Sequence, residues 1–269
     1  MFGNVPREMW KKWHEPDSHG RIDLSCRCLL VESPVGNLLF ETGIGAFFEP
    51  KLADRFGIME KEHMLLENME RIGVSEKDID YVILSHLHFD HAGGVLSPHI
   101  PGEESVLLFP NAKFIVGQEA WQRAKNPHFR DRASFIPQII EKLESSGRLF
   151  LVEEGQCIKE LDGLVEFRYS SGHTPGQMHS LIKGEKSVFF AGDLIPGTHW
   201  VHLPITMGYD RFPEKIIEEK SDLLTEAAKE EWFIFYTHDP QFAVSCVDRN
   251  EKGRFQAVEK VESITRMSL

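Results

Sequence analysis

The stretch that decides the fold is YVILSHLHFDHAGG, residues Tyr81 to Gly94. It opens with a compact run of apolar and β-branched residues, which predicts a short buried strand. Three histidines and an aspartate follow directly, and these are His86, His88, Asp90 and His91. Such a spacing has a low chance of arising without function, so it indicates a binding site at the end of a strand.

Composition narrows the function classes before the motif is interpreted. The chain has 269 residues with 41% hydrophobic content, which is enough to bury a full core. Its 42 acidic and 30 basic residues give a net charge of −12, which disfavours binding to nucleic acid or to an anionic membrane. The first residues lack the apolar segment of a signal peptide, and no run approaches the ~18 apolar residues of a membrane span. We therefore predict a soluble, cytoplasmic protein.

Hydrophobic periodicity predicts strands and helices in a single domain over residues 1–269, because no repeat or linker divides the chain. A hairpin is expected where IDLSCRCLLVES and NLLFETG are joined by a turn, with Cys26 and Cys28 as small core residues rather than metal ligands. Helices are expected over residues 59–72, 118–126, 135–144 and 213–230, and from Arg254 onward. Further strands are expected at DYVILS, KFIV, LFLVE, LVEFRYS, SLIKG, SVFFAGD and WFIFYTHD.

Three further segments repeat the pattern of a strand that ends in a turn with one good ligand. They are YSSGHTPGQ with His173, VFFAGDLIPG with Asp193, and FIFYTHDP with His238. Together with the first cluster they supply five imidazoles and two carboxylates, which suit two borderline divalent ions better than calcium or magnesium. Zinc is the default, with iron, manganese and cobalt as alternatives. No phosphate-binding loop, serine-nucleophile elbow or complete dinucleotide fingerprint competes with this interpretation.

These residues resemble the metallo-β-lactamase fold superfamily of dinuclear hydrolases. The match consists of H-x-H-x-D-H at His86–His91, G-H-T-P-G at Gly172–Gly176, G-D at Gly192–Asp193, and His238 at the end of the last strand. The resemblance implies an α/β (α+β) fold arranged as a four-layer αββα sandwich. It also implies that His86, His88 and His173 bind one ion, that Asp90, His91 and His238 bind a second, and that Asp193 bridges both.

The chemistry of such a site explains the choice of residues. Two cations roughly 3.5–4 Å apart share a water and lower its pKa toward neutrality, which makes a bridging hydroxide nucleophile without a separate strong base. Asp193 would be catalytic as the bridging ligand. Asp90 has a second expected duty, because a carboxylate beside the ions can pass a proton to the leaving group.

Within the superfamily, MFGNVPREMWKKW together with SHLHFDHAGG, AGDLIP and YTHDP is similar to the YtnP-like N-acyl homoserine lactonases and their phosphotriesterase relatives. Such relatives usually begin with an extra strand, so the chain is expected to lack the usual first strand of one sheet. LLFETG stands where the family commonly has Asp-Thr-Gly. Glu41 is therefore interpreted equally as a support for a ligand imidazole or as a residue that merely ends a strand.

Five more residues are candidates for the substrate pocket. His199, Trp200 and His202 follow Asp193 in IPGTHWVHLP, and Phe48 and Trp10 would form an apolar wall. The alternatives are packing of a surface loop for the first three and core packing for the other two. Histidines outside any motif, among them His63 and His179, are expected to be solvated or hydrogen-bonded structural residues.

The function predicted from the sequence is the opening of a lactone or similar small ester, with N-acyl homoserine lactones of quorum sensing as the leading substrate. Phosphotriester, phosphodiester or thioester hydrolysis on the same scaffold is the alternative within the enzyme class. A metal-free binding module is the alternative outside it, and the seven intact ligand positions argue against that hypothesis. The expected partners are a small-molecule substrate and, as an open alternative, a second copy of the chain in a homodimer.

Overall fold

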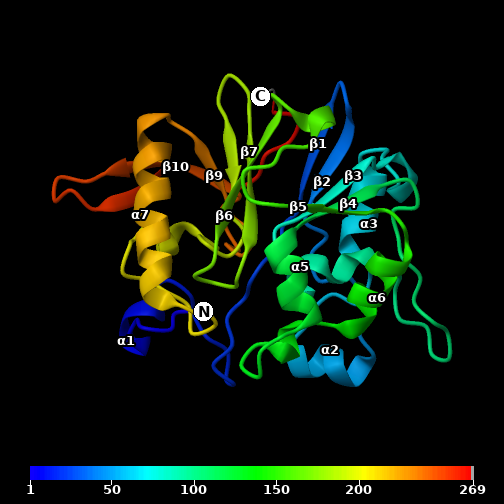
Figure 1. Cartoon of the computed structure of the whole chain (residues 1–269). Coiled ribbons are helices and arrows are strands. Elements are labelled where there is room, and N and C mark those ends of the chain that lie inside the picture. The colour runs from blue at the N-terminus through cyan, green and yellow to red at the C-terminus, as the bar shows by residue number, and fades with distance from the viewer. Residues whose placement is uncertain (268–269) are drawn as a thin grey trace. The chain divides into compact units, whose positions relative to one another are not determined.

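The computed structural model describes residues 1–267 and divides the chain into two compact units (Figure 1). Unit 1 contains Met1–Arg27 and Glu154–Leu269, and unit 2 contains Cys28–Glu153. Each unit has one β-sheet and its own helices, so the predicted α/β class is confirmed. Among the described residues, no helix is both long enough and apolar enough to cross a lipid bilayer.

Unit 2 is built on a five-stranded sheet in the order β1-β2-β3-β4-β5. The strands are β1 (Leu29–Ser33), β2 (Gly36–Phe40), β3 (Tyr81–Leu84), β4 (Lys113–Gly117) and β5 (Leu149–Val152). β1 and β2 form the predicted antiparallel hairpin, and β2 to β5 run parallel. All four residues of β3 are buried, as expected of a central parallel strand with both faces covered.

The helices of unit 2 are α2 (Pro50–Phe56), α3 (Met64–Arg71), α4 (Phe89–Ala92), α5 (Gln118–Lys125) and α6 (Pro137–Ser145). α5 contacts β4, β5 and α6. Trp121 of α5 and Leu143 of α6 join Leu84 and Val116 of the sheet in the core of this unit. The helices predicted over residues 118–126 and 135–144 are thereby confirmed within two residues at each end.

Two expectations for unit 2 were wrong in detail. The helix predicted over residues 59–72 begins only at Met64, because the ring of His63 caps it by accepting a hydrogen bond from the backbone N–H of Leu66. Met59 precedes this cap and is 78% exposed, so it is not a core residue. β1 also begins later than expected, which leaves Cys28 before the strand and only half-buried.

Unit 1 is built on a six-stranded mixed sheet in the order β11-β10-β9-β8-β7-β6. The strands are β6 (Val165–Ser170), β7 (Gln177–Ile182), β8 (Val188–Phe190), β9 (Phe233–Phe235), β10 (Val244–Arg249) and β11 (Phe255–Val261). β8 and β9 are parallel, and the other neighbouring pairs are antiparallel. β10 was not predicted, although Val244 and Cys246 alternate with polar residues along it.

The last helix expected from Arg254 onward is wrong, because this segment forms β11. Val258 pairs with Cys246, and Ala257 pairs with Val247, in an antiparallel ladder. The apolar residues at every third position suggested a helix, but β-branched and aromatic residues form strands when a partner strand is available. Pairing with β10 supplies that partner.

In the described part of unit 1, the α-helices are α1 (Arg7–Trp10) and α7 (Pro213–Lys229). α7 is the long helix predicted over residues 213–230, and it contacts β10 (Figure 1). Pro213 occupies its first turn, where the missing N–H costs nothing. Ile216, Leu224 and Ala227 point from α7 into the core of this unit together with Leu181 and Ile234 of the sheet.

Candidate metal centre

The histidine cluster of unit 2 lies where β3 ends, as the sequence predicted. β3 stops at Leu84, and the one-turn helix α4 begins after His88, so the chain turns sharply through the cluster. His86 and His91 are fully buried, His88 is 7% exposed, and Asp90 is half-buried. A rigid buried strand therefore delivers three imidazoles into the interior, while the carboxylate of Asp90 reaches toward solvent.

The rings of this cluster converge closely. Nε2 of His86 lies 3.0 Å from Nδ1 of His88, and their ring centroids are 4.4 Å apart. The ring of His91 lies 4.1 Å from that of His86, and Oδ2 of Asp90 is 3.8 Å from Nε2 of His91. Two imidazole nitrogens at this separation repel each other unless a proton or a cation lies between them.

The end of β2 supports this cluster through Glu41 and Thr42. Glu41 is buried, its Oε1 accepts a hydrogen bond of 2.9 Å from the backbone N–H of Ser85, and its Oε2 lies 3.6 Å from Nδ1 of His91. The N–H and the hydroxyl of Thr42 both donate to the carbonyl of His91. Glu41 thus ties the end of β2 to the residue after β3 and faces the ring of His91. Its support of a ligand imidazole stays a prediction.

His63 and Gly94 secure the other end of the cluster. Nε2–H of His63 donates to the carbonyl of Gly94 at 3.0 Å, which agrees with the structural role predicted for this histidine. Gly94 itself must be a glycine, since a Cβ there would lie 2.0 Å from the carbonyl oxygen of Thr42. The glycine pair thus lets the chain pass directly against the end of β2.

Unit 1 brings together a second set of predicted ligands, His173, Asp193 and His238. His173 lies between β6 and β7, Asp193 follows β8, and His238 follows β9, so each comes from the end of a strand. All three are buried. Oδ2 of Asp193 lies 3.2 Å from Nε2 of His173, and Oδ1 of the same carboxylate lies 3.0 Å from Nε2 of His238. One carboxylate therefore faces two imidazoles, with one oxygen for each.

The opposite nitrogen of each of these two rings has a hydrogen-bond acceptor. Nδ1 of His173 donates to Oδ1 of the buried Asp210 at 3.0 Å, and Nδ1 of His238 donates to the carbonyl of Ser25 at 2.6 Å. In the neutral rings, Nε2 then carries a lone pair that faces an oxygen of Asp193. Two lone pairs at this distance are unfavourable unless a cation or a proton lies between them, so this donor set fits metal ions.

Sequence reasoning missed Asp210 and Ser25. Asp210 lies in GYDRF, where no motif distinguishes it from the other acidic residues, and Ser25 contributes only a backbone carbonyl. A general rule was the available signal: metal-ligating histidines usually donate their second ring N–H to a carboxylate or a carbonyl. The rule predicts that such an acceptor exists, but it does not say which residue provides it.

His179 shows what a structural histidine looks like in the same unit. Its Nε2 lies 2.8 Å from the hydroxyl of Ser170, and burial lowers its pKa to about 3. The ring is therefore neutral at physiological pH, which agrees with the structural role predicted for it.

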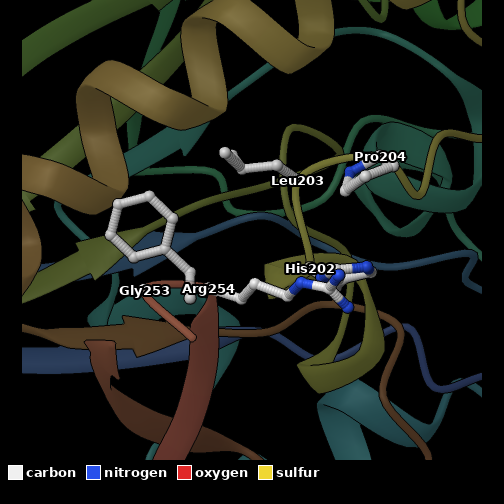
Figure 2. A pocket seen from close by; sticks show the side chains of 6 residues that line it. His202, Leu203, Pro204, Gly253 and Arg254 are labelled. Atoms are coloured by element: carbon white, nitrogen blue, oxygen red, sulfur yellow. The ribbon is translucent and has the colours of Figure 1, made fainter. Parts of the chain in front are cut away.

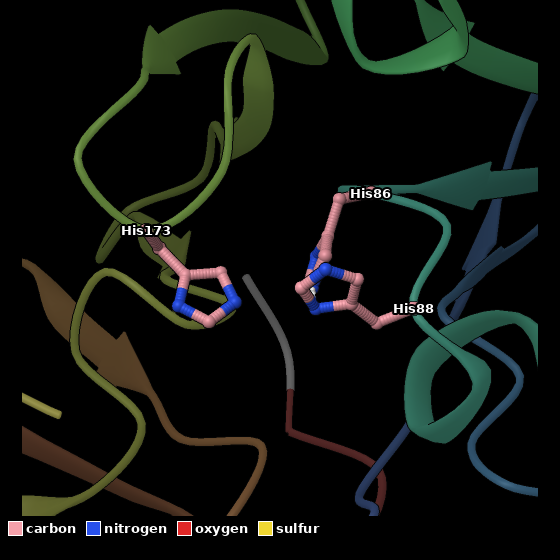
Figure 3. A group of neighbouring side chains, drawn as sticks. All are labelled: His86, His88 and His173. Carbon is pink, nitrogen blue, oxygen red and sulfur yellow. Dashed lines mark hydrogen bonds between the residues drawn. The ribbon is translucent and has the colours of Figure 1, made fainter. Parts of the chain in front are cut away.

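Figure 3 shows His86 and His88 on the loop after β3 of unit 2, and His173 on the loop after β6 of unit 1. The donors of both units are imidazole nitrogens and carboxylate oxygens, which suit zinc and similar ions. The chain thus offers ligands of the right chemistry at the ends of strands in each half.

The five candidate pocket residues lie in three different parts of the structure: an aromatic cluster, a cleft of unit 1 and the core of unit 2. Trp10, His199 and Trp200 belong to an aromatic cluster around Phe2, where the ring of Trp200 stacks on Phe2 at 4.4 Å and the ring of Trp10 at 5.8 Å. The ring of His199 stacks on Trp13 at 4.6 Å, and burial lowers the pKa of His199 to about 4.

His202 lines an open cleft of about 330 Å³ in unit 1 (Figure 2). The other lining residues are Leu203, Pro204, Gly253, Arg254 and Phe255. Phe48, in contrast, is buried in the core of unit 2 and packs on Phe47 at 4.1 Å. Phe48 therefore packs in the core of unit 2, whereas His202 borders a cleft of unit 1. The contact of either residue with substrate stays a prediction.

The fold and the His/Asp donor sets are those of a metal-dependent hydrolase. Residues 21–238 match the family model of the metallo-beta-lactamase superfamily, and the chain belongs to this superfamily. The resemblance seen in the sequence is thereby confirmed, and so is the α/β fold that it implies.

Curated relatives of this chain include N-acyl homoserine lactonases. The protein from Bacillus sp. is 28% identical over 178 residues, which is 62% of this chain and 61% of that protein. The match thus spans about three fifths of the length of that relative. The protein from Bacillus thuringiensis is 25% identical over 241 residues, which is 84% of this chain and 85% of that protein.

Solved structures share the fold at low sequence identity. A probable metal-dependent hydrolase from Staphylococcus aureus superposes with a TM-score of 0.83 at 24% identity, covering 97% of this chain and 92% of that chain. AidC, described as a dizinc quorum-quenching lactonase, superposes with a TM-score of 0.73 at 22% identity, covering 92% of this chain and 82% of that chain.

Proposed function

We propose that the protein is a dinuclear metal-dependent hydrolase that opens a lactone ring, with N-acyl homoserine lactones as the leading substrate. The observation that carries the proposal is the carboxylate of Asp193, whose two oxygens each face a different imidazole nitrogen, at 3.2 Å and 3.0 Å. A carboxylate placed in this way suits a ligand shared by two cations. The lactone substrate is supported by the B. thuringiensis relative. That protein is named an N-acyl homoserine lactonase, and the match covers 85% of its length.

The two donor sets divide the proposed ligands between the units. We assign His86, His88 and His173 to one ion, Asp90, His91 and His238 to the other, and Asp193 to both. When bound, two such ions supply an activated water near neutral pH and a Lewis acid for the ester carbonyl. Zinc is the expected metal because imidazole and carboxylate ligands dominate the set.

The residues of the chain have separate duties in this proposal. Asp210 and the carbonyl of Ser25 orient the rings of His173 and His238, because each accepts a hydrogen bond from the ring nitrogen that would not bind metal. Glu41 faces the corresponding nitrogen of His91. We assign to Asp90 the transfer of a proton to the leaving alkoxide, because its carboxylate lies 3.8 Å from the proposed ligand nitrogen of His91 and would stand beside the ions.

Metal content and lactone opening together test this function. Purified protein loaded with zinc should hold two ions per chain, and it should release acid from an N-acyl homoserine lactone in a pH-stat or indicator assay. A chelator should abolish both. Simple lactones and a phosphotriester complete the panel, and turnover of the phosphotriester alone would contradict the lactone assignment.

Asp193→Asn separates the bridging role from general loss of charge. The variant should bind fewer than two zinc ions and should lose lactone opening by at least about a hundredfold, as expected for a lost metal ligand. Asp248→Asn is the matched control, because Asp248 is an exposed carboxylate on β10 of the same unit. Full metal content in Asp193→Asn would refute the proposed bridge.

A further inference from the structure

The loop that carries His173 lies directly on α7. At Gly172, a Cβ would lie 2.6 Å from Cγ1 of Ile216, 2.7 Å from the backbone nitrogen of Ile216 and 2.8 Å from Oε2 of Glu219. Contacts this short do not occur for a real side chain, so a residue other than glycine would push the loop off the helix. The glycine of the G-H-T-P-G motif is therefore explained by close approach to α7.

Glu219 then fastens this loop to the helix with both carboxylate oxygens. Oε1 accepts a hydrogen bond of 2.8 Å from the N–H of Ser171, and Oε2 accepts one of 3.0 Å from the N–H of Gly172. The side chain is only 17% exposed, and burial raises its pKa, with the two N–H donors acting in the opposite direction. Charged acceptors form stronger hydrogen bonds than neutral ones, so this is a firm two-point attachment.

The other side of the same loop is held by the segment that precedes α7. The N–H of Arg211 donates to the carbonyl of His173, and the N–H of Phe212 donates to the carbonyl of Gly172. Asp210 of this segment accepts from the ring of His173. Backbone, ring and neighbouring amides of His173 are thus all held by residues 210–219.

We infer that Glu219 is a positioning residue for His173, and that it sets the metal affinity of the site to which His173 contributes. The inference rests on the proposed role of His173 as a ligand. Glu219 touches neither metal nor substrate, and it acts through the backbone of Ser171 and Gly172. Fixing the loop before the ion arrives removes the need to order it on binding, which is how pre-organisation raises affinity.

Glu219→Gln tests this role, because glutamine has a similar shape but only one acceptor oxygen. Its NH₂ group would face one of the two backbone N–H donors, so one attachment becomes repulsive. Zinc affinity, measured on the full chain by competition with a chromophoric chelator, should fall about 10-fold or more for one of the two ions. Glu218→Gln is the matched control, since Glu218 is the exposed neighbour on α7, and its zinc affinity should stay within about twofold.

Thermal unfolding without metal separates positioning from a purely structural role. If Glu219→Gln lowers the melting temperature of the metal-free protein but leaves both zinc affinities unchanged, the inference is overturned. Glu219→Asp covers the case in which the glutamine variant does not fold. Aspartate keeps the charge but is too short to reach both amides, so its zinc affinity should fall in the same direction by a smaller factor, and unchanged affinity would again overturn the inference.

The inference and the proposed function can fail separately. Protein that binds two zinc ions with the expected loss in Glu219→Gln, yet opens no lactone, would refute the substrate while leaving the role of Glu219 standing. Protein that opens lactones with the same zinc affinity in wild type and Glu219→Gln would refute the role of Glu219 alone.

Discussion

Replacement of Lys220 by methionine should change how the stability of this protein depends on pH. Lys220 follows Glu219 on α7, has no exposed surface, and donates to the carbonyls of Ile205, Trp200 and His202 at 2.7, 2.9 and 3.4 Å. Burial lowers the pKa of its ammonium group from 10.5 to about 7, and the carboxylate of Asp210 acts in the opposite direction. Methionine preserves the length and the apolar stem but removes the charge.

The sign of the effect follows from where the proton resides. Between pH 7 and pH 10.5 the unfolded chain keeps the proton on Lys220, while the folded protein releases it, so the free energy of unfolding rises with pH in this window. Each pH unit contributes at most about 1.4 kcal/mol, so the whole window contributes on the order of 4 kcal/mol. The methionine variant lacks this contribution, and the difference between wild type and variant should therefore grow in favour of the wild type as pH rises.

Urea unfolding of the metal-free protein measures this difference directly. Wild type and Lys220→Met are compared at several pH values from 6 to 10, in the presence of a chelator so that metal binding does not contribute. At high pH the variant should be the less stable protein, because buried carbonyls that lose a donor cost about 1–3 kcal/mol each. Lys229→Met is the control, since the side chain of Lys229 is 78% exposed, and its difference from wild type should change little over the same range.

A flat difference between wild type and Lys220→Met from pH 6 to pH 10 would refute this reasoning. It would mean that Lys220 stays charged in the folded protein at pH 9, so that its three carbonyl partners compensate fully for burial. His202, whose pKa is lowered by burial and by nearby Arg254 and Lys220, titrates below this window and does not imitate the effect.

Three further outcomes are expected. Asp210→Asn should lower zinc affinity about 10- to 100-fold in chelator competition, because the amide cannot hold the ring of His173 as a carboxylate does, and unchanged affinity would contradict this role. Glu41→Gln should weaken zinc binding about tenfold in the same assay, since an amide NH₂ facing Nδ1 of His91 favours the wrong tautomer, and a wild-type value would return Glu41 to a strand-ending residue. Leu143→Ala should lower the free energy of unfolding by about 2–5 kcal/mol in urea, because the side chain of Leu143 is fully buried in unit 2. The control Glu141→Ala, at an exposed position, should lower it by well under 1 kcal/mol, and equal losses would contradict the assigned core.

Local sequence was sufficient to predict most of the strands and helices and to select the candidate ligands. The apolar run before His86 predicted β3, and Pro213 with the apolar spacing after it predicted α7, since both signals lie within a few residues of the structure that they specify. Ser75 and Asp78 form a capping box just ahead of β3, which is likewise a signal contained within a few residues. His173, Asp193 and His238 could be selected as candidate ligands because each follows a recognisable strand with a short motif.

Contacts between distant segments account for what the sequence did not reveal. The stretch after Arg254 became β11 rather than a helix because β10 pairs with it, and periodicity alone cannot register a partner strand. Asp210 and Glu219 have no motif, and their roles depend on bringing residues 210–219 against the loop of His173, about 40 residues earlier in the chain. The local spacing of the sequence therefore determines which side chains are candidate ligands, because metal chemistry demands particular residue types. The orientation of those side chains depends on tertiary packing, because the groups that hold each ring come from remote positions in the chain.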